Sequence, residues 1–136
     1  MTRKILVGTD TTASADMAVS AAAELAGERE AELLVLYVRT DDRATEAADP
    51  HKRADPQRYL ARMGERFPQL RVRSWSEPGD PADRICEVAA EERVDTIVLG
   101  NKGVRGPRWR VRESVPNLVL RHAPCSVFIV DTRAAQ

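Results

Sequence analysis

Short apolar runs separated by helical patterns constrain this chain most strongly. The runs at 32–39, 95–99 and 126–131 are nearly continuous in apolar residues, which is typical of parallel strands covered on both faces. A further run occupies 4–9, and the run at 71–77 alternates, so we expect it at an edge of the sheet. Strand–helix alternation with short connections predicts right-handed crossovers and a mostly parallel sheet, hence an α/β fold.

Helical signals fill the gaps between these runs. The first helix should end near Gly27, and a short second helix carries Tyr59, Leu60 and Met63 on one face before Phe67-Pro68. The third begins at Asp80, a good N-cap that is followed by proline, and the fourth follows Ser114. The one long connection, residues 40–56, is rich in Asp, Ala and Pro, and we expect a loop there rather than a domain boundary.

Composition and length describe one globular domain, residues 1–136. The chain is 43% hydrophobic and 31% charged, unlike disordered or membrane proteins. Its 21 basic and 21 acidic side chains give zero net charge. This balance argues against a protein that binds nucleic acid or an anionic membrane over its whole surface. No run approaches the roughly 20 apolar residues of a membrane span. Two separated cysteines, Cys86 and Cys125, form neither a disulfide framework nor a zinc site, so we expect a cytoplasmic protein without a bound metal.

A candidate ligand site lies at the carboxyl ends of the strands, where open parallel sheets bind ligands. The first strand ends in Asp10, the second near Val38, and the fourth at Gly100. The loop after the fourth strand holds three of the chain's seven glycines and five cations, and it leads into the helix at Ser114. Glycine lets backbone N–H groups approach a phosphate, and a helix N-terminus adds partial positive charge. Phosphate binding and a solvated basic loop explain this segment equally well, and Asp10 could instead cap the first helix.

The order of these pieces resembles the universal stress protein family. The residues that carry the resemblance are the strand ending in Asp10, then Gly79-Asp80-Pro81, then Gly100-x-x-Gly103, followed after nine residues by Glu113-Ser114, and finally the segment 121–127. The resemblance covers essentially the whole chain. It implies a five-stranded open sheet in the order 3-2-1-4-5 with helices on both faces (Rossmann-like), and a homodimer through the last strand.

One branch of that family binds ATP, with Mg²⁺ accompanying the nucleotide. The resemblance implies that Asp10 contacts the adenine or ribose side and that Val38 lines the adenine pocket. Gly100 and Gly103 would hold ribose and phosphates, while Ser114 and the valine after it would meet the terminal phosphates. The residues of this sequence assigned to the nucleotide are Gly8, Thr9, Asp10, Val38, Leu99, Gly100, Gly103, Glu113, Ser114 and Val115.

Two departures from the family pattern bear on function. The usual Asp-Gly-Ser reads Asp10-Thr11-Thr12 here, a mild change because Thr12 or Ser14 can cap the helix. Glu113 replaces a glycine whose N–H faces phosphate, and a like charge at that distance costs orders of magnitude in affinity. The loop arginines offset part of this cost.

Two functions follow as hypotheses. The first is a nucleotide-binding regulatory protein of the stress response, whose ligand state alters the loop from Gly100 to Glu113 and thereby a surface for an unidentified protein partner. The second is a homodimeric interaction module whose phosphate site is closed by Glu113. No phosphate-binding P-loop, serine nucleophile elbow or histidine pair with metal spacing occurs, so we expect no enzyme beyond slow, incidental ATP hydrolysis.

Overall fold

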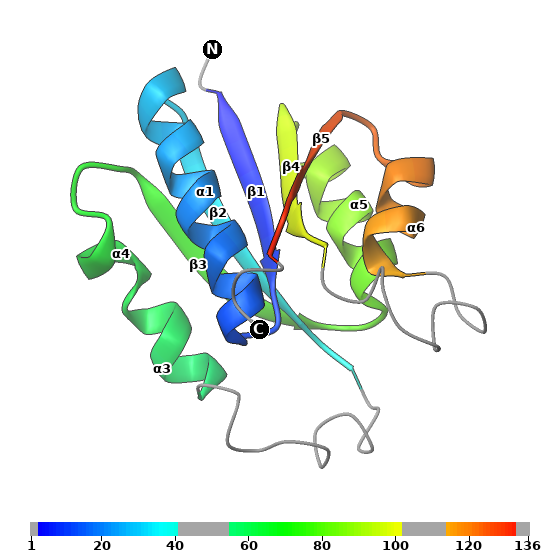
Figure 1. Ribbon diagram of the computed structural model, residues 1–136, viewed down its shortest axis with the longest axis horizontal. Coiled ribbons are helices and arrows are strands. Elements are labelled where there is room, and N and C mark those ends of the chain that lie inside the picture. Colours follow the sequence, from blue (N-terminus) through cyan, green and yellow to red (C-terminus); the bar gives the residue numbers. More distant parts are fainter. Residues whose placement is uncertain (1–2, 41–54, 102–113, 133–136) are drawn as a thin grey trace.

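The computed structural model describes residues 3–40, 55–101 and 114–132. They form a five-stranded, wholly parallel sheet in the order β3-β2-β1-β4-β5, as the resemblance implied (Figure 1). The order reverses between β1 and β4, because the chain builds outward first from β1 to β3 and then from β4 to β5. The strands are β1 Lys4–Thr9, β2 Glu32–Arg39, β3 Val72–Pro78, β4 Thr96–Gly100 and β5 Ser126–Val130.

Helices cover both faces of this sheet (Figure 1). On one face α1 packs on β1, β2 and β4, while α3 and α4 pack on β3. On the opposite face α5 packs on β1 and β2, and α6 packs on β5 and α5. The helices are α1 Ala13–Arg29, α3 Pro56–Ala61, α4 Met63–Arg66, α5 Pro81–Glu91 and α6 Val115–His122.

Two apolar cores result, one on each side of the sheet. Val7 and Val35 belong to the core under α1, which the alanines of that helix complete. Leu6 and Leu36 belong to the core under α5 and α6. Successive residues of a strand point to opposite faces, so β1, β2 and β4 are buried on both sides. Their continuous apolar sequences therefore predicted their position correctly.

The expectation that β5 is covered on both faces is wrong. Among the described strands β5 lies at the edge and pairs with β4 alone, and Phe128 at its centre is 50% exposed. Val127 and Ile129 pack against the core under α5 and α6, whereas Ser126 and Phe128, which alternate with them along the strand, are exposed. A continuous apolar run marks burial in a monomer or at an interface, and the sequence does not separate the two cases.

The predicted end of the first helix near Gly27 is confirmed. α1 ends at Arg29, two residues past this glycine, and Glu30 after it takes the left-handed conformation with φ of 54°. One helix prediction needs correction, because the single short helix expected around Tyr59, Leu60 and Met63 is two short helices, α3 and α4, that meet at Arg62. The N-caps predicted from sequence are confirmed, since Thr12, Asp80 and Ser114 each accept a hydrogen bond from the first turn of the helix that follows.

Candidate functional site

The candidate site sits at the carboxyl edge of the sheet, where the strand order reverses. Thr9 pairs with Tyr37 at the end of the β1–β2 ladder, so continuing that register by one residue places Asp10 opposite Val38. β4 lies on the other side of β1 and ends at Gly100. The fold therefore brings Asp10, Val38 and Gly100 to one edge, around the switch point where open α/β sheets bind ligands.

The turn between β1 and α1 is held by hydrogen bonds among its own residues. Asp10 Oδ1 accepts from the backbone N–H of Thr12 at 3.0 Å and from the Thr12 hydroxyl. The Thr12 oxygen accepts from the Ala15 N–H and caps α1, so Asp10 does not cap the helix but fixes the residue that does. Among the residues that the structure describes, none donates a hydrogen bond to Asp10 Oδ2.

Thr11 shows that the departure from Asp-Gly-Ser is not mild for the backbone. Its φ is 65°, in the left-handed region that β-branched residues rarely adopt. Thr11 is also only 4% exposed, so the strained residue is buried directly beside Asp10. Thr12 preserves the cap as expected, but the turn contains strain that glycine would not have.

Thr9 lies at the same edge of the sheet, but its side chain already makes a hydrogen bond within the turn. By strand alternation it shares the α1 face with Ile5 and Val7, opposite to Gly8. Its hydroxyl oxygen accepts the Thr11 N–H at 3.0 Å. Thr9 is 7% exposed.

Gly8 and Leu99 meet inside the core under α5. A Cβ on Gly8 would lie 2.9 Å from Ile85 Cδ1 and 3.1 Å from Leu99 Cδ2. Leu99 is itself 5% exposed. Because Gly8 has no side chain, α5 can pack closely on β1. This close packing explains why a glycine stands at this position.

Gly100 and Asn101 join the ends of β4 and β5. The Asn101 side-chain oxygen accepts from Thr132 N at 3.0 Å and from the Thr132 hydroxyl at 2.9 Å. The Asn101 N–H donates to Val130 O at 3.0 Å. Asn101 and Thr132 were not predicted from the sequence, where the one signal is that Asn101 stands inside the Gly100-x-x-Gly103 motif.

α6 begins at the same edge, because it runs antiparallel to the strands and ends just before β5 (Figure 1). Ser114 Oγ accepts from the Asn117 N–H at 3.3 Å, and Val115 is the first helical residue. Ser114 and Val115 thus lie where a helix N-terminus can face an anion. Gly103 and Glu113, with the basic residues and Trp109 between them, lie outside the described residues.

Asp16 and Tyr59 tie α1 to the helices that follow β2. The Tyr59 hydroxyl donates to Asp16 Oδ1 at 2.6 Å, and Arg66 donates to both carboxylate oxygens and to Ser20. Burial alone would raise the pKa of Asp16, but the hydrogen bonds from Arg66 and Tyr59 outweigh burial and lower it. Burial and the bond to Asp16 raise the pKa of Tyr59. Tyr59 was not among the site residues predicted from the sequence.

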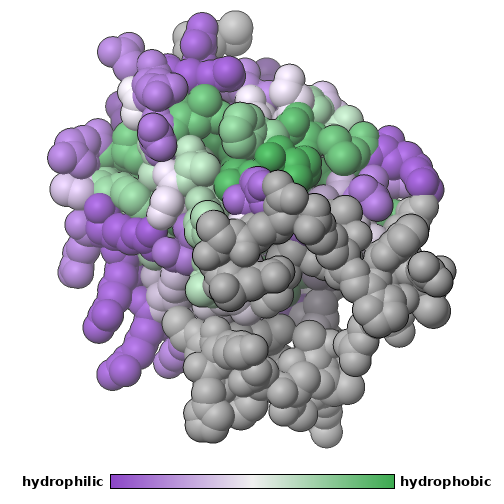
Figure 2. Space-filling model, viewed as in Figure 1, coloured by the Kyte–Doolittle hydropathy of each residue, from purple (hydrophilic) through white to green (hydrophobic). Residues whose placement is uncertain are grey.

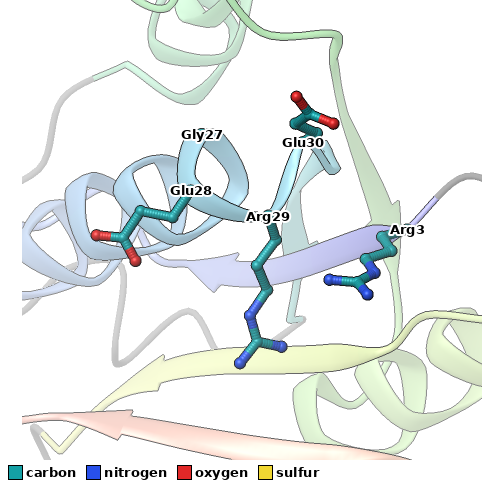
Figure 3. Close-up of a pocket in the computed structure, with 5 residues that line it drawn as sticks. All are labelled: Arg3, Gly27, Glu28, Arg29 and Glu30. Atoms are coloured by element: carbon teal, nitrogen blue, oxygen red, sulfur yellow. The ribbon is translucent and has the colours of Figure 1, made fainter.

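A depression of about 510 Å³ lies at the opposite end of the sheet (Figure 3). Its lining comes from the residue before β1 and from the C-terminal end of α1, and it mixes both signs of charge. These side chains do not converge on one point in Figure 3. The lining residues are Arg3, Gly27, Glu28, Arg29 and Glu30.

The described residues show neither a cysteine activated as a nucleophile nor a cluster of metal ligands. Cys86 and Cys125 are free thiols, and burial raises the pKa of each, so both are less reactive than an exposed cysteine. Within residues 3–40, 55–101 and 114–132 no group of three or more His, Cys, Asp or Glu side chains could hold a metal. No helix in those ranges is long and apolar enough to cross a membrane.

The sequence model of the universal stress protein family matches residues 1–131. The chain belongs to the universal stress protein family. A universal stress protein of Methanothermobacter thermautotrophicus is 33% identical to it, with 97% of each chain covered. Universal stress protein Rv1636 of Mycobacterium tuberculosis is 31% identical, covering 96% of this chain and 97% of the relative.

Among solved structures, a universal stress protein in complex with cAMP superposes with a TM-score of 0.80. It is 25% identical and covers 96% of this chain and 97% of its own. The family assignment and the parallel order 3-2-1-4-5, both inferred from sequence, are confirmed.

Proposed function

We propose that this universal stress protein binds an adenine nucleotide at the switch point between β1 and β4. The observation that carries the proposal is the Asp10 turn, where one carboxylate oxygen is fixed by Thr12 while the other faces no described partner. An oriented carboxylate oxygen is a suitable acceptor for ribose hydroxyls. The related structure that contains cAMP gives independent support for this ligand class.

The rest of the edge suits the other parts of a nucleotide. Val38 is apolar and lies at the carboxyl end of β2, where the 8% of it that is exposed would lie against a base. The N-terminus of α6 at Ser114 offers partial positive charge to phosphate. Mg²⁺ would be needed only with a polyphosphate such as ATP, where it would be held by the nucleotide.

Glu113 governs which nucleotide is accepted. It directly precedes the N-cap Ser114 in the sequence, so its charge opposes the phosphate affinity of the helix start. Repulsion grows with ligand charge; a cyclic monophosphate with one negative charge is therefore disfavoured less than ATP. We expect the order cAMP, then AMP, then ATP for the native chain.

Calorimetric titration with cAMP, AMP and Mg²⁺-ATP tests this proposal. The native chain should bind at least one of them, and Asp10→Asn should weaken binding because it replaces the open acceptor by a donor while its amide oxygen can still accept from Thr12. Asp95→Asn is the matched control, since Asp95 accepts from the Lys4 N–H at the other end of the sheet. Binding that appears only in Glu113→Gly would mean that Glu113 closes the site. Silence from both chains would contradict the proposal.

The second part of the proposal is a homodimer that forms through β5. The same dimer is required by the alternative function, a homodimeric interaction module. No strand in the described part of the chain pairs with the outer edge of β5, and Phe128 at the centre of this strand is 50% exposed. Figure 2 shows apolar side chains gathered on the face of the molecule where β5 lies at the front in Figure 1. An exposed apolar edge strand favours pairing with a second copy.

Light scattering after size-exclusion chromatography tests the dimer. We expect a dimer for the native chain and a monomer for Phe128→Asp, with circular dichroism showing that the variant is folded. A native chain that is monomeric at high concentration would contradict this part alone. We further propose a regulatory rather than enzymatic role, which steady release of ADP from ATP by the purified protein would contradict.

A further inference from the structure

The ladder between β1 and β4 ends before the Asp10 turn. Its last pair is Val7 with Val98, whereas β1 and β2 stay paired to the end of β1. The paired part of β1 and β4 therefore stops short of the switch point. There the Asp10 turn stands on one side, and Gly100 and Asn101 stand on the other.

Asn101 joins the end of β4 to three successive residues at the end of β5. Its N–H donates to Val130 O at 3.0 Å, and its side-chain nitrogen donates to Asp131 Oδ1 at 3.4 Å. Its side-chain oxygen accepts from the Thr132 N–H at 3.0 Å and from the Thr132 hydroxyl at 2.9 Å. We call these last two hydrogen bonds, between Asn101 and Thr132, the clamp. All of these partners come from the β5 side, so β5 fixes the position of Asn101.

The position of Asn101 determines where the backbone of Gly100 points. Backbone groups of neighbouring strand residues point to opposite sides of the strand, and the Asn101 N–H is directed to β5. The N–H and C=O of Gly100 are therefore directed to the β1 side, where the Asp10 turn lies. A ligand at the switch point would meet these two groups, with Thr132 behind them on the β5 side.

Thr132 is packed where β4 and α1 meet. A Cβ on Gly100 would lie 2.9 Å from Thr132 Cγ2, 3.6 Å from Ser14 O and 3.8 Å from Ala18 Cβ, so these atoms share one small space. Thr132 is 1% exposed, and both its N–H and its hydroxyl donate to Asn101. It is therefore the buried half of the clamp and has no surface to offer a nucleotide.

We propose that Asn101 and Thr132 are positioning residues, which hold the end of β4 in its ligand-binding conformation without contacting the nucleotide. The inference rests on the proposed nucleotide function and deepens it. Among the described strands β5 pairs with β4 alone, and the end of such a strand opens easily unless side chains hold it. Opening of the clamp would release Gly100 and lower the affinity. A bound nucleotide should in turn hold the clamp closed, because such coupling is reciprocal.

Nucleotide titration of clamp variants tests the proposal. Thr132→Val removes the hydroxyl but keeps the methyl group beside Gly100, and it should weaken cAMP binding about fivefold, the effect of one net hydrogen bond. Asn101→Ala removes both bonds of the clamp and should weaken binding at least as much. The double variant should lose little more than Asn101→Ala, because both residues act through one contact. Thr132→Ser keeps both donors and should bind like the native chain.

Two controls separate positioning from other effects. Thr96→Val makes the same change in a buried threonine that pairs with Ser126 at the opposite end of the β4–β5 ladder, and it should keep native affinity. Arg73→Gln breaks ion pairs at the amino end of the strands, so it should lower the melting temperature without changing cAMP affinity. Weaker binding in Asn101→Ala with native affinity in Thr132→Val would mean that Asn101 contacts the nucleotide itself, and it would overturn the proposal.

Amide hydrogen exchange gives a readout that a merely structural role would not move. Saturating cAMP should slow exchange of the Thr132 amide in the native chain, although the nucleotide does not touch this residue. In Asn101→Ala the same addition should leave the Thr132 amide unchanged. Native exchange of Thr132 that does not respond to bound cAMP would contradict the reciprocal coupling.

Exchange without nucleotide separates this inference from the proposed function. If the native chain binds no nucleotide, the proposed function fails, while the Asn101 amide still reports on the end of β4. Faster exchange of the Asn101 amide in Thr132→Val, with a native rate in Thr96→Val, would then support the clamp as the device that holds this end. A native rate in Thr132→Val would overturn it.

Discussion

Thr132 occupies the space that a side chain would take at Gly100. A Cβ on Gly100 would lie 2.9 Å from Thr132 Cγ2, closer than such atoms approach in folded proteins. Thr132 is 1% exposed and hydrogen-bonded to Asn101, so it has little freedom to move away. The glycine that ends β4 is therefore required for packing before any ligand is considered.

Gly100→Ala should destabilise the protein by about 1–3 kcal/mol, the cost of overpacking a core. Thr132→Ser removes the opposing methyl group but keeps the hydroxyl that donates to Asn101. The double variant should therefore recover part of the loss, as contacting residues do in a double-mutant cycle. Urea unfolding measures both effects. Gly64→Ala is the control, since a Cβ there meets nothing within 4 Å, and equal destabilisation of the two alanine variants would contradict the packing account.

Ser114 combines two roles that substitution can separate. Ser114→Ala should cost about 1 kcal/mol of stability, because the Asn117 N–H loses its acceptor. Ser114→Asp keeps a favoured N-cap and should retain stability, yet its charge should weaken nucleotide binding. Thermal unfolding and titration, run on both variants, check this. Unimpaired nucleotide binding by Ser114→Asp would remove the start of α6 from the site.

Asp16 should make the stability of the protein depend on acid pH. Hydrogen bonds from Arg66 and Tyr59 lower its folded-state pKa below the ordinary value of 3.8 despite burial. A lowered pKa contributes stability above the unfolded-state pKa, and this contribution is lost as the pH falls through the folded-state value. The stability difference between the native chain and Asp16→Asn should therefore shrink between about pH 6 and about pH 3. A difference that stays constant over that range, measured by urea unfolding, would contradict the assignment.

Glu30 ends α1 in a conformation that suits glycine. Its φ is 54°, its N–H bonds back to Ala26 and Gly27, and its side chain is exposed. Glu30→Gly should stabilise the protein by about 0.5–1 kcal/mol, because glycine adopts left-handed backbone without steric cost. Glu30→Ala removes the same side chain without that freedom and should bring no such gain. Both variants should bind nucleotide like the native chain, because the residue lies at the far end of the sheet.

The sequence predicted the central fold well, because burial on both faces leaves a direct mark on composition. β1, β2 and β4 were located within a residue or two, and each helix with a strong N-cap was identified. β5 carries the same apolar pattern but is half-exposed, because the sequence cannot say whether a second molecule covers Phe128. α1 passed Gly27 because a single glycine costs too little to end a well-packed helix.

The sequence predicted the location of the candidate site better than it predicted the contacts among the residues that form it. Asp10, Val38 and Gly100 reach one edge because parallel strands share their direction. Tyr59 could not be placed there from sequence, since its contact with Asp16 spans 43 residues and has no periodic signature. The strain at Thr11 also depends on the backbone conformation, which a Gly-to-Thr difference in sequence suggests but does not establish.

Amide chemical shifts of the isotope-labelled protein, recorded while cAMP is added, test the central claim most directly. The nucleotide site at the switch point predicts shifts at Asp10, Thr12, Val38, Asn101 and Ser114, with Lys4 and Glu92 at the amino end unchanged. Shifts confined to Arg3, Arg29 and Glu30 would place the ligand in the depression at the opposite end. That result, or an unchanged spectrum with cAMP, AMP and ATP alike, would contradict the account.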